Sequence, residues 1–146
     1  MPTIKSSYLG RLRTQATHVL SGNALITDAP LDNNGKGEAF SPTDLVCAAL
    51  GSCMVTIMGI VAERDGVSLE GLSWEITKMM ESSPRKIKEI QVDFHWSGAP
   101  FTPEFSQKLK NAARTCPVAL SLDPAVTQTI SFDFLVAFRL PFFLKK

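Results

Sequence analysis

The chain has 146 residues, of which 45% are hydrophobic and 20% are charged, and these values are ordinary for one globular domain with its own core. The formal net charge of +1 argues against nucleic acid or an anionic membrane surface as a partner, because both require a strongly basic face. The three cysteines, and first residues that lack an apolar segment, lead us to expect a cytoplasmic protein without a disulfide framework.

The first part of the chain predicts an antiparallel meander of strands. Residues 3–9 and 12–20 are rich in β-forming side chains and are separated by Gly10. After a turn, residues 24–27 predict a further short strand.

Residues 28–40 are polar and rich in turn-forming residues, which predicts a surface loop. The positions of Asp and Asn in it do not match a calcium-binding loop, and its Gly-Lys-Gly sequence lacks the spacing of a phosphate-binding loop. Because the loop leads directly into the next predicted helix, we expect it to form the rim of a site.

Residues 41–66 predict a long helix around which the rest of the chain is organised. Ser41 can cap its first turn, Pro42 suits the first helical position, and Asp44 completes a capping box. At the other end, Gly66 can adopt the left-handed backbone conformation that terminates a helix. Nearly every side chain between these signals is apolar or small, which predicts a helix buried on all sides. Its caps and interruptions argue against a bilayer span.

The remaining segments are two strands, two helices and a closing strand. We expect strands at 73–80, 87–96 and 126–134, a turn at 98–102, and helices from 103 to 114 and over 118–122. The chain is therefore predicted to be a single α+β domain over residues 1–146, with an apolar C-terminal extension at 135–146 that is too short to span a bilayer. Since one small sheet covers only one side of an apolar helix, we expect a second subunit to cover the other.

The cysteines are candidates for chemistry, and their spacing excludes some of it. Cys47 and Cys53 are six residues apart on the predicted helix, so they are turned by about 240° from each other and cannot form a redox pair on one face. The chain has no Cys-x-x-Cys motif, and only His18 and His95 could supply imidazole ligands. Neither a metal nor another cofactor is therefore expected. Cys53 and Cys116 remain, although a free cysteine often only fills space in a core.

The two remaining cysteines differ in their predicted surroundings. Cys116 precedes Pro117 at the start of a short helix, where free N–H groups and the helix dipole favour a thiolate. Cys53 lies about three turns into its helix, beyond the range of that effect, among small residues that leave room for another group. On the dipole alone, Cys116 is the more acidic thiol.

A thiolate at Cys53 would need a cationic partner, and a guanidinium is the obvious one. Arg11 and Arg13 are predicted to point to the same face of an early strand, and Arg114 lies beside Cys116 in the sequence. Each of these arginines could equally be a solvated surface charge.

Two motifs stand far apart in the chain, SPTDLVCAALGSCM at 41–54 and TCPVALSL at 115–122. Together with the segments YLGRLRTQATH, SGNALITDAPLDNNGKGEAFSPTDL and PRKIKEIQVDFHW, they resemble the OsmC/Ohr family of osmotically inducible and organic-hydroperoxide-resistance proteins. The chain is most similar to the OsmC-like branch of that family. The resemblance extends from Tyr8 to Phe134.

The resemblance implies a fold in which antiparallel sheets wrap around a long central helix, and an intertwined homodimer with sites at the subunit interface. It also implies a thiol-dependent peroxidase that reduces organic hydroperoxides, with Cys53 as the reactive cysteine, Cys116 as the resolving cysteine and a dithiol as the reductant. Arg13, or alternatively Arg11, would stabilise the thiolate. Family peroxidases hold this arginine with a glutamate near the helix start, and the matching position here is Thr43.

A second hypothesis follows from Thr43, which cannot ionise. Without a carboxylate to hold the arginine, the chain would be a non-enzymatic thiol protein that binds a small apolar ligand or senses oxidants at the dimer interface. A purely structural interpretation of the cysteines predicts no disulfide between Cys53 and Cys116 after peroxide treatment.

Overall fold

The computed structural model describes residues 1–137 as two compact units. The first unit spans Met1–Cys47 and the second begins at Ala48, and each is described by itself. Most of the predicted C-terminal extension, residues 138–146, lies outside the described residues. That the whole chain forms a single domain stays a prediction.

The first unit contains the antiparallel meander that the sequence predicts. Its strands are β1 (Ile4–Gly10), β2 (Arg13–His18) and β3 (Ala24–Asp28), in the order β1-β2-β3. Gly10 pairs with Arg13, and the two residues between them have positive φ angles, 54° at Arg11 and 64° at Leu12, as in the tight turns that match the twist of a hairpin. Arg11 therefore lies in a turn and not on the strand that carries Arg13, which corrects the prediction that the two share a strand face.

The predicted loop that follows is ordered by its own backbone. It contains a short 3-10 helix, η1 (Leu31–Asn33), and it closes where Thr27 bridges Phe40 and the N–H of Asp28 donates to the Phe40 carbonyl at 3.0 Å. Gly35 is required, because a Cβ there would lie only 1.7 Å from the Ala29 carbonyl oxygen. The loop thus returns the chain to the end of β3 immediately before the long helix.

The long helix is α1 (Pro42–Arg64), and both of its predicted ends are confirmed. The N–H of Ser41 donates to Asp44 Oδ2 at 2.9 Å, and the N–H of Asp44 donates to Ser41 Oγ at 3.1 Å, which is the reciprocal pair of a capping box. Gly66 has a φ of 70°, and its N–H donates to the Glu63 carbonyl at 3.0 Å, as in a left-handed helix stop.

Only one face of α1 is buried within the described chain. That face comprises the core residues Cys47, Leu50, Met54, Met58 and Ala62. The opposite stripe is exposed and comprises Ala49, Ser52, Thr56 and Ile60. By length and composition alone α1 could cross a membrane, yet just 33% of its most apolar window is buried in the chain. Burial on all sides, as predicted from the sequence, is therefore not provided by residues 1–137 of one copy.

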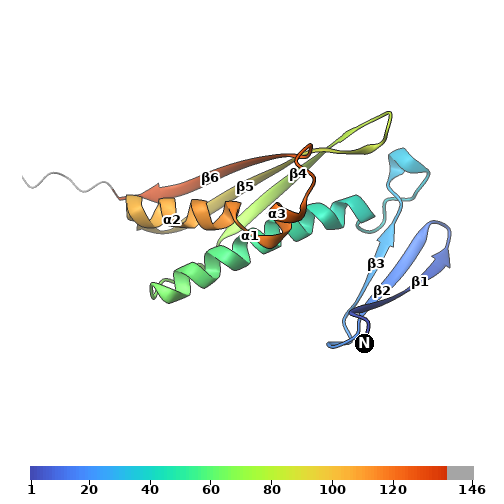
Figure 1. Ribbon diagram of the computed structural model, residues 1–146, viewed down its shortest axis with the longest axis horizontal. Coiled ribbons are helices and arrows are strands. Elements are labelled where there is room, and N and C mark those ends of the chain that lie inside the picture. The colour runs from blue at the N-terminus through green and yellow to red at the C-terminus, as the bar shows by residue number, and fades with distance from the viewer. Residues whose placement is uncertain (138–146) are drawn as a thin grey trace, which may run out of the picture. The chain divides into compact units, whose positions relative to one another are not determined.

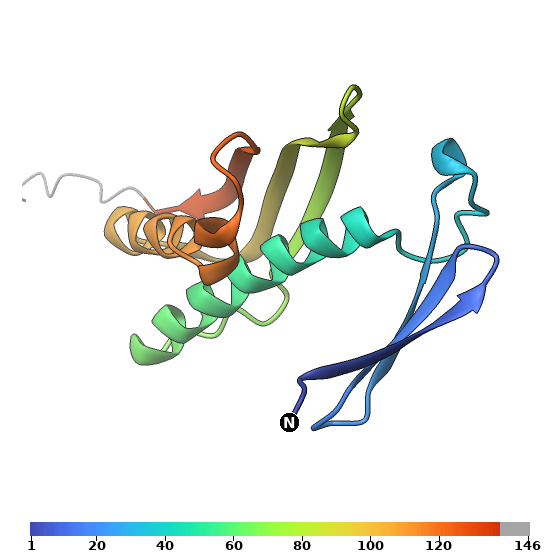
Figure 2. The same ribbon diagram turned by 45° about the vertical axis from the view of Figure 1, so that its right-hand side comes forward.

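The sheet of the second unit is mixed. It consists of β4 (Ser73–Glu81), β5 (Lys86–Phe101) and β6 (Thr127–Val136), in the order β4-β5-β6. The pair β4 and β5 is antiparallel, but β5 and β6 are parallel, which corrects the expectation of purely antiparallel sheets. The reason is that α2 (Pro103–Arg114) and α3 (Pro117–Ser121) form a crossover between these strands, as a parallel pair requires. Figures 1 and 2 show α1 and α2 on the same face of this sheet.

The predicted inner face of β5 forms the core of the second unit. Ile90, Val92 and Phe94 are fully buried, as their alternation indicates. The strand then continues through the turn that was predicted at 98–102. In this segment the Trp96 indole N–H donates to the Ala99 carbonyl at 2.9 Å, and the register with β6 is irregular between Trp96 and Phe101.

Candidate thiol site

The second unit brings Cys53 and Cys116 together. Cys53 lies near the middle of α1 and is partly exposed, whereas Cys116 lies at the N-terminal end of α3 and is fully buried. The Cys53 side chain lies close enough to Cys116 to help raise the pKa of that thiol, and both are free thiols. The structure therefore juxtaposes the two cysteines that the sequence singles out, although they come from helices far apart in the chain.

Cys116 has the local position predicted for it but not the predicted acidity. It is the N-cap of α3, and its Sγ accepts a hydrogen bond from the Ala119 N–H at 3.3 Å. Burial, however, raises the pKa of the Cys116 thiol, and the neighbouring Cys53 raises it further, while the Ala119 N–H acts in the opposite direction. Burial thus outweighs the helix end at Cys116, so that this thiol is less acidic than the dipole argument alone predicts.

The small residues around Cys53 do not all have open space beside them. A Cβ on Gly51 would lie 2.6 Å from Trp74 Nε1 and 2.8 Å from Ile76 Cδ1. The absence of a side chain at Gly51 thus allows β4 to pack against α1 two residues from the thiol, and the space that the sequence left for another group is filled on that side of the helix. Ser52 is exposed beside the cysteine.

The first unit carries a separate charged cluster around Arg13. Arg13 and Asp28 are register partners on β2 and β3, and Arg13 Nη2 lies 3.3 Å from Asp28 Oδ2. The same nitrogen forms an ion pair with the Glu38 carboxylate. Hydrogen bonds from Arg13 to Asp28 and then to Glu38 raise the pKa of the arginine. The pKa of Asp28 is lowered, first by the N–H of Glu38, against the effect of burial, and then by Arg13.

The other candidate side chains have different surroundings. Arg114 places its guanidinium 5.6 Å from the centroid of the Phe132 ring, which is a cation–π distance. Thr43 Oγ1 lies 3.2 Å from Ser41 Oγ at the start of α1. Arg13 belongs to the first unit and the cysteine pair to the second, so that the role of Arg13 as thiolate stabiliser stays a prediction.

Sequence reasoning missed Asp28 and Glu38 as partners of Arg13. The register of the meander was a usable signal for Asp28, because the turn at Arg11 and Leu12 and the pairing of β2 with β3 place Asp28 opposite Arg13. For Glu38 the sequence has no comparable signal, since its position depends on how the loop folds back.

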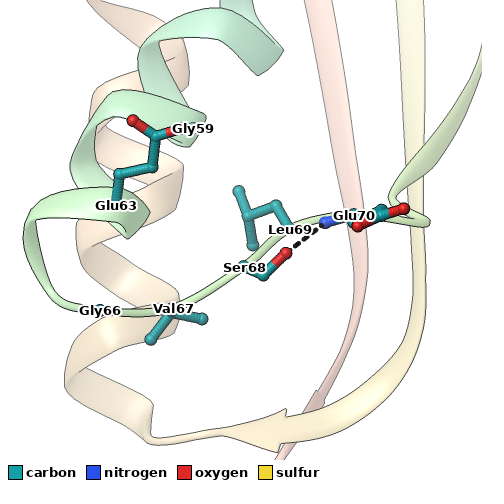
Figure 3. Close-up of a pocket in the computed structure, with 7 residues that line it drawn as sticks. All are labelled: Gly59, Glu63, Gly66, Val67, Ser68, Leu69 and Glu70. Atoms are coloured by element: carbon teal, nitrogen blue, oxygen red, sulfur yellow. Dashed lines mark hydrogen bonds between the residues drawn. The ribbon is translucent and has the colours of Figure 1, made fainter.

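Two surface hollows of the second unit are separate from the thiol pair. One has a volume of about 540 Å³ at the C-terminal end of α1, and Figure 3 shows its lining. It is formed by Gly59, Glu63 and residues 66–70. The other, of about 420 Å³, is lined mainly by Trp96, Phe101 and Phe105 together with neighbouring loop residues. No cysteine lines either hollow. Within residues 1–137, no three His, Cys, Asp or Glu side chains gather closely enough to hold a metal ion.

Comparison with known proteins decides the family. Residues 35–131 match the family model described as OsmC-like protein. The chain belongs to the OsmC-like protein family. No curated protein matches the sequence.

Several solved structures are similar to the OsmC-like chain. It is 43% identical to a protein of Psychrobacter arcticus named for osmotic stress induction and a detoxification response, with 90% of this chain and 96% of that chain covered and a TM-score of 0.87. The organic hydroperoxide resistance protein OsmC of Legionella pneumophila is 20% identical, with coverage of 91% and 98% and a TM-score of 0.70. An OsmC-like protein of Mycoplasma pneumoniae is 14% identical, with coverage of 92% and 96% and a TM-score of 0.71. The last two show the fold alone. The α+β OsmC-like fold predicted from the sequence is thus confirmed.

Proposed function

We propose that this OsmC-like protein is a thiol-dependent peroxidase that reduces organic hydroperoxides. The observation that carries the proposal is the pair of neighbouring free thiols, Cys53 on α1 and Cys116 at the start of α3. The names of structural relatives add support, since the Legionella protein is named for resistance to organic hydroperoxides. The family alone would not assign an activity, because function depends on the site and not on the fold.

The two thiols differ in the way that this chemistry requires. Cys53 is partly exposed, so that a substrate can reach it, whereas Cys116 is fully buried. The raised pKa of Cys116 keeps it protonated while Cys53 reacts. A solvent-accessible nucleophile beside a buried resolving thiol is the arrangement expected of a redox-active pair.

The reaction can be written so that atoms and electrons balance. The Cys53 thiolate attacks one oxygen of the hydroperoxide, the O–O bond breaks, and the departing alkoxide takes a proton to leave as an alcohol. Cys53 is now a sulfenic acid. The sulfur of Cys116 then attacks the Cys53 sulfur, a disulfide forms, and the hydroxyl leaves as water. A dithiol reductant returns the disulfide to two thiols by exchange.

The assembly that we propose is an intertwined homodimer of single-domain chains. The exposed stripe of α1, which includes Ile60, and exposed apolar side chains of the first sheet, such as Tyr8 and Leu25, would be covered by a second copy. In this dimer Arg13 stabilises the Cys53 thiolate. We also propose that the protein acts in the cytoplasm, without a membrane span and without nucleic acid as a partner.

The decisive test is the consumption of an organic hydroperoxide by the full chain with a small dithiol as reductant. Wild-type protein should turn over many times per site, and Cys53→Ser should abolish this turnover. Cys47→Ser is the matched control, because Cys47 lies on the same helix but belongs to the other unit. A Cys53→Ser protein as active as wild type would refute the proposal.

A second function is favoured by one observation, the presence of Thr43 where family peroxidases carry a glutamate. In this alternative the protein is a non-enzymatic thiol protein that binds a small apolar ligand or senses oxidants. It predicts that peroxide oxidises Cys53 and Cys116 once but that no multiple turnover follows when dithiol is supplied.

A further inference from the structure

We propose that residues 138–146 dock on their own chain, in the surface hollow of about 420 Å³ that Trp96, Phe101 and Phe105 line. We call this hollow the aromatic hollow. The inference does not depend on the proposed peroxidase function, because both the hollow and its occupant lie outside the two cysteine motifs. It assigns an interaction surface to the second unit and names the segment that fills it.

The walls of the aromatic hollow are rings that pack on one another. The Phe101 ring stacks on Trp96 with 5.2 Å between their centroids, and the Phe105 ring meets Phe101 edge-on at the same distance. Val67 adds apolar surface on the opposite side of the hollow from α2. The Trp96 indole N–H already donates to the Ala99 carbonyl at 2.9 Å, so the indole has no free donor. Such a surface suits an occupant with apolar and aromatic side chains.

The described part of the chain leads directly to this hollow. Val136, the last residue of β6, is the register partner of Phe101, and the N–H of Ala137 donates to the Phe101 carbonyl at 2.8 Å. Figure 1 shows the end of β6 beside the start of α2. The nine residues 138–146 therefore begin next to a wall of the hollow, and at full extension they can reach about 30 Å.

The composition of residues 138–146 fits an apolar hollow. Their sequence, FRLPFFLKK, contains three phenylalanines and two leucines. Left uncovered, these side chains and the hollow would form two apolar patches close together, and patches of that kind mark interaction sites. Pro141 lacks the backbone N–H that a longer β6 would need, which argues against simple continuation of the strand.

The charges of the segment and of the surface beyond the hollow are opposite. Three of the nine residues are basic and none is acidic. The second hollow, at the end of α1, shares Val67 and Ser68 with the aromatic hollow and is also lined by Glu63 and Glu70, as Figure 3 shows. Neither carboxylate forms an ion pair with another residue of 1–137. A segment that crosses the aromatic hollow would bring the lysines at 145–146 toward them, and exposed pairs of this kind orient a segment more than they hold it.

A free apolar molecule or the same segment of a second copy could fill the aromatic hollow instead. The covalent link favours the chain's own segment, because it makes docking an intramolecular event with an effective concentration in the millimolar range for a short linker. A free occupant would have to match that concentration or bind much more tightly. The adjacency of Ala137 and Phe101 is therefore the observation that decides between these occupants.

The test replaces Phe142 by the photo-crosslinking residue p-benzoylphenylalanine in the full chain. Irradiation should give a crosslink within one chain to residues that line the aromatic hollow, identified by peptide mass mapping. The same residue in place of Leu135 is the matched control, because Leu135 is 55% exposed and alternates with Phe134, whose ring contacts Phe101. It should not crosslink to the hollow.

A blocking substitution tests the seat itself. Ser68→Arg places bulk and positive charge where the two hollows meet, so it should lower the yield of the crosslink from position 142 several-fold. Ser73→Arg is the matched control, since Ser73 is exposed on β4 and lines neither hollow, and it should leave the yield unchanged.

Trp96 supplies a second readout, because it lines the hollow. In the full chain with Trp74→Phe, Trp96 is the remaining tryptophan. Phe142→Ser together with Phe143→Ser should shift its emission to longer wavelength and increase its quenching by acrylamide. The crosslink requires no change in the core, so it still decides the question where Trp74→Phe fails to fold.

Three results would overturn the proposal. The first is a crosslink from position 142 that maps outside the aromatic hollow or to a second copy, and the second is Trp96 emission that the two serine substitutions leave unchanged. The third is a crosslink from position 142 to lipid, in vesicles of phosphatidylcholine and phosphatidylglycerol, from a chain that gives no crosslink to the hollow without them. That result would assign the segment to a membrane surface.

Discussion

Replacing Gly51 by alanine tests the packing of α1 against β4 beside the thiol pair. The added Cβ would lie 2.6 Å from Trp74 Nε1, 2.8 Å from Ile76 Cδ1 and 3.0 Å from Trp74 Cδ1. These contacts are too short to persist, so the indole or the helix must shift. Overpacking of this kind costs about 1–3 kcal/mol. Alanine regains about 0.5–1 kcal/mol from its higher helix propensity.

The net expectation for Gly51→Ala is a loss of about 0–2.5 kcal/mol in the free energy of unfolding, after the propensity gain is subtracted from the overpacking cost. For a chain of 146 residues this corresponds to a Tm lower by up to roughly 10 °C. The assay is urea unfolding followed by circular dichroism at several protein concentrations, because dimerisation would make the stability depend on concentration.

Gly59→Ala is the control on the same helix. A Cβ on Gly59 meets no atom within 4 Å, so the substitution should raise the free energy of unfolding by about 0.5–1 kcal/mol from helix propensity alone. If Gly51→Ala stabilises the protein as much as Gly59→Ala does, the described contact between α1 and β4 is wrong.

Two further predictions concern the ends of α1 and the buried thiol. Asp44→Ala and Ser41→Ala each remove half of the capping box and should lower the free energy of unfolding by about 1 kcal/mol, measured by urea unfolding; no change in either would contradict the capping role. Burial raises the pKa of Cys116 above the ordinary 9.0, so that the folded chain keeps a proton that the unfolded chain releases. The resulting stabilisation is complete below pH 9.0 and is lost as the pH rises through the folded pKa, and Cys116→Ala should flatten this alkaline decline in Tm.

Features that depend on neighbouring residues were predictable from the sequence. The capping box at Ser41 and Asp44 and the stop at Gly66 follow from local hydrogen bonding and backbone freedom, and the structure has them. The buried face of β5 follows from alternation alone, as Ile90 and Val92 show.

Features that depend on distant partners were not predictable. The parallel pairing of β5 with β6 is set by the crossover through α2 and α3, and a strand pattern is the same for either direction. The acidity of Cys116 was misjudged because its burial comes from tertiary packing and not from the adjacent proline. Glu38 escaped notice because a flexible-looking loop has no periodicity that places its side chains.

The parallel strand has a consequence for the order in which the protein is assembled. Cys116 lies at the start of α3, and Gln128 Nε2 of β6 donates to the Ala119 carbonyl of that helix at 3.0 Å. The helix that begins at Cys116 is therefore held by a strand made after both cysteines have been synthesised. Because parallel pairing across a crossover is a slow, long-range event, the dithiol is completed late. A nascent chain that has released Cys53 and Cys116 but not yet paired β6 carries two unpartnered thiols, and its protection from oxidants then depends on the cell and not on its own fold.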